Sequence, residues 1–135
     1  MLSSVSLSMA YGAMAIVFFA IDLVWIGIVA SGFYRRHLGF MLRSDVQWVP
    51  AVLFYLLFIA GVLLFVVIPA VERQSLGRAA LLGAFFGLVT YATYDLTNLA
   101  LAKGFPTVVA IVDMTWGAVI SAVIAMVGYG VVASR

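Results

Sequence analysis

Four long apolar runs, separated by short polar segments, dominate the chain. They cover approximately residues 9–30, 49–71, 77–102 and 108–133. Each run is long enough to cross a bilayer, because a membrane-spanning helix needs about 20 apolar residues. The short connections place consecutive helices side by side and antiparallel. The pattern therefore predicts one all-α transmembrane domain over residues 1–135, an antiparallel bundle of four transmembrane helices.

The polar segment between the first two runs, residues 32–48, is the only sizeable one in the sequence. Four of its apolar residues fit one face of a helix, with arginines beside them: Tyr34, Leu38, Met41 and Leu42. This spacing is typical of a short basic helix that lies among lipid headgroups. An ordinary basic loop with aromatic anchors explains it equally well. Gly32 and Gly39 count against a helix, and both interpretations stay open.

The composition indicates that lipid surrounds most of the protein. The chain is 67% hydrophobic and 9% charged, with a mean hydropathy of +1.26, whereas soluble domains are about 25% charged. Because so few polar side chains could cover a core in water, we expect the lipid bilayer to be the main partner. The sequence predicts an integral membrane protein.

Charge and residue types exclude several functions. Seven Lys and Arg residues and five acids give a net charge of +2. No basic run is dense enough to follow a phosphate backbone, so no nucleic-acid partner is expected. The lack of Cys excludes disulfides and iron–sulfur clusters, and the single His37 cannot form a bis-histidine haem site. No cofactor is firmly implied.

Three acids, Asp22, Asp95 and Asp113, lie inside the apolar runs, where ionisable side chains are costly and by default mark a functional site. We call the membrane face that carries the N-terminus side A and the opposite face side B. With a rise of ~1.5 Å per residue, Asp22 lies about 12 Å, Asp95 about 10 Å and Asp113 about 8 Å from the side B end of its helix. The three acids are therefore predicted at one level, in the leaflet of side B.

Small residues accompany two of these acids at a spacing of four. The third run carries Gly83, Gly87, Tyr91 and Asp95 on one stripe, and the fourth carries Asp113, Gly117, Ser121 and Ala125. Small residues let helix backbones approach closely in membranes. The pattern predicts that the third and fourth helices pack tightly, with Asp95 near Asp113.

Each acid opens a short motif: DLVW from Asp22, DLTN from Asp95 and DMTW from Asp113. The spacing puts the acid and an aromatic or amide side chain on one helix face. Asp95 and Asn98 could together offer oxygens to a hard cation. Thr97, Tyr91 and Tyr94 are candidate further ligands or hydrogen-bond donors, and the candidate walls of the site are Trp25, Trp116 and Tyr94.

The segments FAIDLVWIGIVASGFYRRHLG, YATYDLTNLALAKGFP and VDMTWGAVISAV carry a resemblance that covers essentially the whole chain. They resemble domain-of-unknown-function family 2177, a family of small predicted bacterial membrane proteins. The resemblance implies a multi-pass protein with four spans in the bacterial inner (plasma) membrane. It implies no activity, substrate or catalytic residue.

The first functional hypothesis is a proton or cation site. Like charges in a low-dielectric setting cannot all ionise unless they are countered, so the group should hold a proton or a cation. Asp95 and Asp113 would form its centre, with Asp22 and Asn98 completing it. A divalent cation bound by the three aspartates is the one cofactor this allows. Four spans are few for a complete translocation path, so solute transport would require a homo-oligomer.

Two alternatives remain. In a lipid-binding or lipid-modifying enzyme the acids would hold a divalent cation or act as acid and base, while basic residues bind the headgroup phosphate. Those residues are Arg35, Arg36, Arg43 and Lys103. In a structural membrane subunit the acids would instead accept hydrogen bonds from Thr97, Thr115, Tyr94 or an indole N–H. The sequence marks no catalytic residue.

The basic residues also suggest an orientation. Side B carries the four basic residues just named, and side A carries Arg73, Arg78 and Arg135. The positive-inside rule then places side B in the cytoplasm and both termini outside it.

Overall fold

The computed structural model describes residues 2–41 and 47–135, and Arg43 and Leu42 lie outside this range. The described part is helical and contains no strand. The helices, in chain order, are α1 (Ser4–Val24), η1 (Trp25–Ala30), α2 (Ser31–Leu38), α3 (Trp48–Val62), η2 (Leu63–Val67), α4 (Ile68–Glu72), α5 (Leu76–Leu101) and α6 (Thr107–Ala133).

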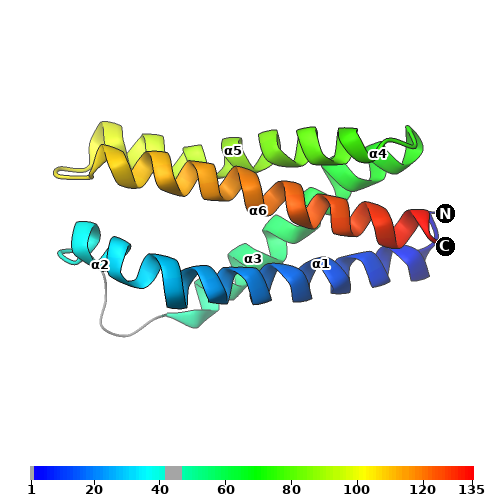
Figure 1. The fold of residues 1–135 in the computed structure, drawn as a ribbon, viewed down its shortest axis with the longest axis horizontal. Coiled ribbons are helices and arrows are strands. Elements are labelled where there is room, and N and C mark those ends of the chain that lie inside the picture. Colours follow the sequence, from blue (N-terminus) through cyan, green and yellow to red (C-terminus); the bar gives the residue numbers. More distant parts are fainter. Residues whose placement is uncertain (1, 42–46) are drawn as a thin grey trace.

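Within the described residues, four helical stretches are long and apolar enough to cross a membrane. They are Ser4–Ile28, Trp48–Glu72, Leu76–Leu101 and Thr107–Ala133. Figure 1 shows an elongated bundle with both termini at one end, and with α2 and the α5–α6 turn at the other. The predicted all-α class with four spans is confirmed.

Local capping explains where the first and third spans begin. Helix α1 starts at Ser4, and not near residue 9, because Ser3 and Ser6 form a capping box. The sequence prediction followed hydropathy and missed these serines. Helix α5 starts after Ser75, whose hydroxyl accepts the Arg78 backbone N–H at 3.0 Å.

Two spans contain a wider π-helical segment. Segment η1 follows α1 directly, so Trp25 starts the wider turn three positions after Asp22. Segment η2 ends just before Ile68 and Pro69. Proline has no backbone N–H and its ring collides with the preceding turn, so a wider turn before Pro69 accommodates it. Segments of this kind are rare and often lie at functional sites.

Helices α5 and α6 pack through the two predicted stripes. A Cβ atom at Gly83 would lie 2.8 Å from the Ala125 Cβ, and one at Gly87 would collide with the Gly117 carbonyl oxygen and the Ser121 hydroxyl. The two backbones are therefore in close contact, as the spacing of small residues predicted.

The segment after the first span is a helix as far as Leu38, followed by a turn. Leu38 is buried in a small cluster with Phe105, Val109 and Ala110 at the α5–α6 turn. The basic side chains of α2, Arg35 and Arg36, are exposed. Of the two interpretations of this segment, the helix is correct for residues 31–38. Here α2 packs against the side B end of the bundle.

Candidate functional site

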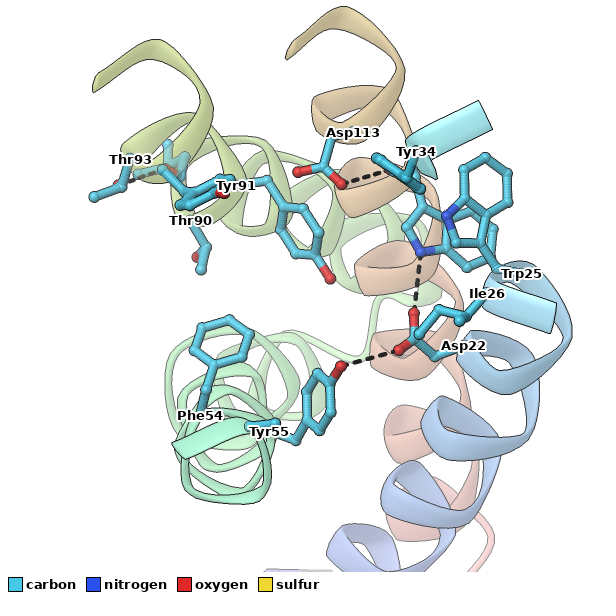
Figure 2. A pocket seen from close by; sticks show the side chains of 14 residues that line it. Asp22, Trp25, Ile26, Tyr34, Phe54, Tyr55, Thr90, Tyr91, Thr93 and Asp113 are labelled. Carbon is cyan, nitrogen blue, oxygen red and sulfur yellow. Dashed lines mark hydrogen bonds between the residues drawn. The ribbon is translucent and has the colours of Figure 1, made fainter. Parts of the chain in front are cut away.

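A cavity of about 880 Å³ lies between the spans, beside η1 and α2. Figure 2 shows its lining, which comes from all four spans and from α2. The lining residues are Asp22, Trp25, Ile26, Tyr34, Ala51, Phe54, Tyr55, Val89, Thr90, Tyr91, Thr93, Tyr94, Asp113 and Trp116. Several are half exposed, Ile26 at 49%, Phe54 at 43% and Val89 at 50%, so the cavity opens to the surroundings of the bundle.

Asp22 lies on one wall of this cavity and is 9% exposed. Its carboxylate accepts two hydrogen bonds, from the Tyr55 hydroxyl at 3.2 Å and from the Trp116 indole N–H at 3.3 Å. These donors belong to α3 and α6, so Asp22 connects three spans. Figure 2 shows both bonds converging on it.

Asp113 lies on another wall and is partly buried. It accepts a hydrogen bond of 2.8 Å from the Tyr34 hydroxyl of α2. Burial, together with the Asp113 carboxylate, raises the pKa of Tyr34 above its ordinary value. The bond between Tyr34 and Asp113 joins α2 to the wall of the cavity.

Asp95 lies behind the cavity wall. It is 0% exposed, and neither carboxyl oxygen has a hydrogen-bond partner in the described part of the chain. Asp113 is close enough to interact electrostatically with both Asp95 and Asp22. The three acids therefore form one neighbourhood, but only Asp22 and Asp113 line the cavity.

Aromatic rings make up much of the remaining wall. Trp25 and Trp116 stack with ring centroids 4.2 Å apart and an interplanar angle of 7°. Tyr91 packs on Gly117, where a side chain would collide with its ring, and Figure 2 shows this ring pointing between Asp113 and Tyr55. The hydroxyls of Thr90 and Thr93 donate to carbonyls of their own helix at 2.7 and 2.8 Å. Polar groups that face the cavity are therefore few.

The structure separates the residues that the sequence singled out. Trp25, Trp116, Tyr91 and Tyr94 line the cavity. Thr97 is exposed and Asn98 partly buried, and neither lines the cavity, because both lie on other faces of α5.

The basic residues predicted to bind a lipid headgroup do not line the cavity. Arg35, Arg36 and Lys103 are exposed outside it, and Arg43 lies outside the described residues.

The three-aspartate metal site suggested by the sequence has no counterpart in this geometry. Among the described residues, no group of three His, Cys, Asp or Glu side chains is arranged to hold a metal ion. The physical reason is that the acids have different surroundings. Asp22 is held by α3 and α6, Asp113 by α2, and Asp95 is enclosed between helices. Of the donors expected in the structural interpretation, an indole N–H is present, whereas Thr115 donates to the Ile111 carbonyl.

Sequence reasoning missed the contribution of α3 and α2. Tyr55 and Phe54 line the cavity from α3, and Tyr34 reaches it from α2. A signal for Tyr55 was present, because it is the one polar side chain in an otherwise apolar second run. A phenol in such a run needs a hydrogen-bond partner, and a buried acid on a neighbouring span can supply one.

These features define a small membrane protein of four spans with an acid-bearing aromatic cavity near the α2 end of the bundle. A family model described as "Predicted membrane protein", that of domain-of-unknown-function family 2177, matches residues 7–130. The chain belongs to this family. No curated protein and no solved structure matches it.

Proposed function

We propose that this protein binds a small organic cation within the membrane, in the cavity between Asp22 and Asp113, and that it acts in the transport of such solutes. One observation carries the proposal. A single cavity has two acids from separate spans and several aromatic rings on its walls, and none of its described lining residues is Lys, Arg or His. A cavity of this composition favours positive charge.

Electrostatics supports a cationic ligand. A carboxylate removed from water costs several kcal/mol unless a partner compensates it. Tyr34, Tyr55 and Trp116 supply hydrogen bonds to the two carboxylates but no positive charge. A bound cation would supply that charge, and the faces of aromatic rings attract cations by about 0.5–2 kcal/mol each.

The shape and chemistry of the cavity favour an organic over an inorganic cation. Hard cations such as Ca²⁺ take about six to eight oxygen ligands at short range, and the acids do not converge in that way. Stacked indoles and phenols instead suit a weakly hydrated ammonium or phosphonium with apolar substituents. About 880 Å³ is enough space for a ligand of that kind.

The two alternatives have less support. Arg35, Arg36 and Lys103 do not line the cavity, so a headgroup phosphate there would have no basic partner among the described lining residues. The hydrogen bonds to Asp22 do fit a structural role, because they join three spans. That role predicts loss of stability in acid variants, whereas the proposed role predicts loss of cation binding.

The test compares two ions of the same shape and opposite charge. Tetraphenylphosphonium and tetraphenylborate are titrated into the detergent-solubilised protein, and heats of binding are recorded. We expect saturable binding of the phosphonium only, lost in the double variant Asp22→Asn plus Asp113→Asn and kept in Glu72→Gln, an exposed acid distant from the cavity. Equal binding of both ions, or binding that survives the double variant, contradicts the proposal. A copurified phospholipid displaced by the phosphonium would favour the lipid alternative.

We further propose that transport takes place in a dimer or larger assembly in the bacterial inner membrane, with side B in the cytoplasm. Four spans leave little protein to enclose a complete path, and side B carries more basic residues than side A. A reporter that is active only in the cytoplasm, fused to either terminus, should be inactive. Activity of such a fusion would reverse the orientation.

A further inference from the structure

Asp95 is the one aspartate of the three that the proposed binding role leaves unexplained. It is fully buried between α5 and α6, and both of its oxygens lack a hydrogen-bond partner in the described residues. Buried polar groups in proteins are nearly always hydrogen-bonded. An ionised carboxylate without partners costs far more free energy than a protonated one, so such a group neutralises itself by taking up a proton.

The charged and polar groups around Asp95 also favour its protonated form. The described groups that interact with it electrostatically are Asp113 of α6, Tyr94 of its own helix and Tyr34 of α2. Segments η2 and α4 also pack on α5 and contribute one charged residue, Glu72, toward side A. Every one of these groups is an acid or a phenol. Among the described residues, a negative charge on Asp95 therefore has no positive charge to offset it while the cavity is empty.

We propose that Asp95 holds a proton in the empty protein and gives it up when an organic cation binds beside Asp113, so that the protein exchanges protons for cations. This inference rests on the proposed function. The positive charge of the ligand replaces that of the proton, so the net charge of the site is unchanged. Asp113 borders both Asp95 and the cavity, and it provides the route by which the proton passes from the Asp95 carboxyl to water.

The exchange has a defined pH dependence. If binding releases a proton, the cation competes with protons, and its affinity rises with pH. The logarithm of the association constant should then rise by up to one per pH unit across the range in which Asp95 is protonated in the empty protein and ionised in the complex. A site without exchange gives a flat profile over that range.

The experiment is calorimetric titration of tetraphenylphosphonium at one pH, in two buffers that differ in ionisation enthalpy. The difference in heat gives the number of protons released. We expect a fraction of a proton up to one per ligand for the intact protein and for the matched control Glu72→Gln. Asp95→Asn keeps the shape and burial of the side chain, and it should bind the ligand with no proton release. Binding without release by the intact protein, or undiminished release by Asp95→Asn, overturns the exchange.

A second measurement needs no ligand and separates the two proposals. Infrared spectra of the empty protein at neutral pH should contain the C=O stretching band of a protonated carboxylic acid. That band should be lost in Asp95→Asn and should weaken when the phosphonium is added. An unchanged band in Asp95→Asn overturns the assignment of the proton to Asp95. If the phosphonium does not bind at all, the proposed function fails, whereas the infrared band still reports whether Asp95 is protonated.

Discussion

The two halves of the bundle are built differently although the same four spans pass through both. In the half toward the termini, the side chains of Met14, Val67, Ile124 and Val132 are fully buried and belong to one hydrophobic core. In the half toward α2, the N-terminal part of α3 is largely exposed, with Val49 at 72%, and a cavity occupies the space between the spans. One half is closely packed, and the other leaves a cavity that the proposed ligand would fill.

Replacing a glycine in the α5–α6 contact should have the largest effect of all, and that effect should be a loss of stability. A side chain at Gly87 collides with the Gly117 carbonyl oxygen and the Ser121 hydroxyl. Overpacking a buried contact usually costs 1–3 kcal/mol, and because backbone atoms are involved we expect Gly87→Val to cost about 3 kcal/mol. The same change at Gly12, where nothing lies within 4 Å, is the control. Thermal unfolding in detergent measures both, and equal midpoints would show that the close contact is not needed for stability.

Removing one charge from the cavity should have the next largest effect, on binding and not on folding. Loss of one partner of a buried charge pair costs about 2–5 kcal/mol. Asp113 is only partly buried, so we expect the lower end, roughly a 30-fold weaker affinity for tetraphenylphosphonium in Asp113→Asn. The unfolding midpoint should change little. If it falls while the affinity is kept, Asp113 ties the helices together and is not a counter-charge.

Substitution of Trp25 tests the aromatic wall of the cavity, and we expect a smaller effect on affinity. Its ring stacks on Trp116 beside the cavity. A ring of this kind contributes about 1 kcal/mol to cation binding, so Trp25→Leu should weaken phosphonium affinity about fivefold. Trp48→Leu is the control, because Trp48 is exposed at the start of α3 and does not line the cavity. Equal effects of the two variants would assign the loss to lipid or detergent contacts.

The smallest effect concerns the bond between α2 and the cavity, and it is visible at alkaline pH. Burial and the neighbouring Asp113 carboxylate raise the pKa of Tyr34 above its ordinary value, which is about 10. The folded protein keeps this proton at a pH where the unfolded chain has lost it, so the stabilising contribution is complete below about pH 10 and declines as the pH rises further. Tyr34→Phe should therefore flatten the alkaline fall in unfolding midpoint. An alkaline profile identical to that of the intact protein would contradict the role assigned to this bond.

The sequence by itself determined the class, the four spans and much of the α5–α6 contact. Hydropathy indicates whether water or lipid surrounds a segment, so long apolar runs were sufficient to predict membrane helices. The spacing of Gly83, Gly87 and Gly117 predicted the close contact because only small residues permit it. The acids were noticeable because charge is rare in such runs, and Trp25 and Trp116 were predicted as walls because they lie near them.

Only the tertiary structure decided which acids face the cavity and what they contact. A helix surrounded by lipid is apolar on every side, so its sequence gives little indication of which face turns toward the protein. For that reason the contributions of Phe54 and Tyr55 from α3 were not predicted. The same ambiguity hid the difference between Asp113, which lines the cavity, and Asp95, which lies behind it. The rotation of each helix about its axis decides which residues face the cavity. Packing between the spans sets that rotation, and the sequence of one span does not contain this information.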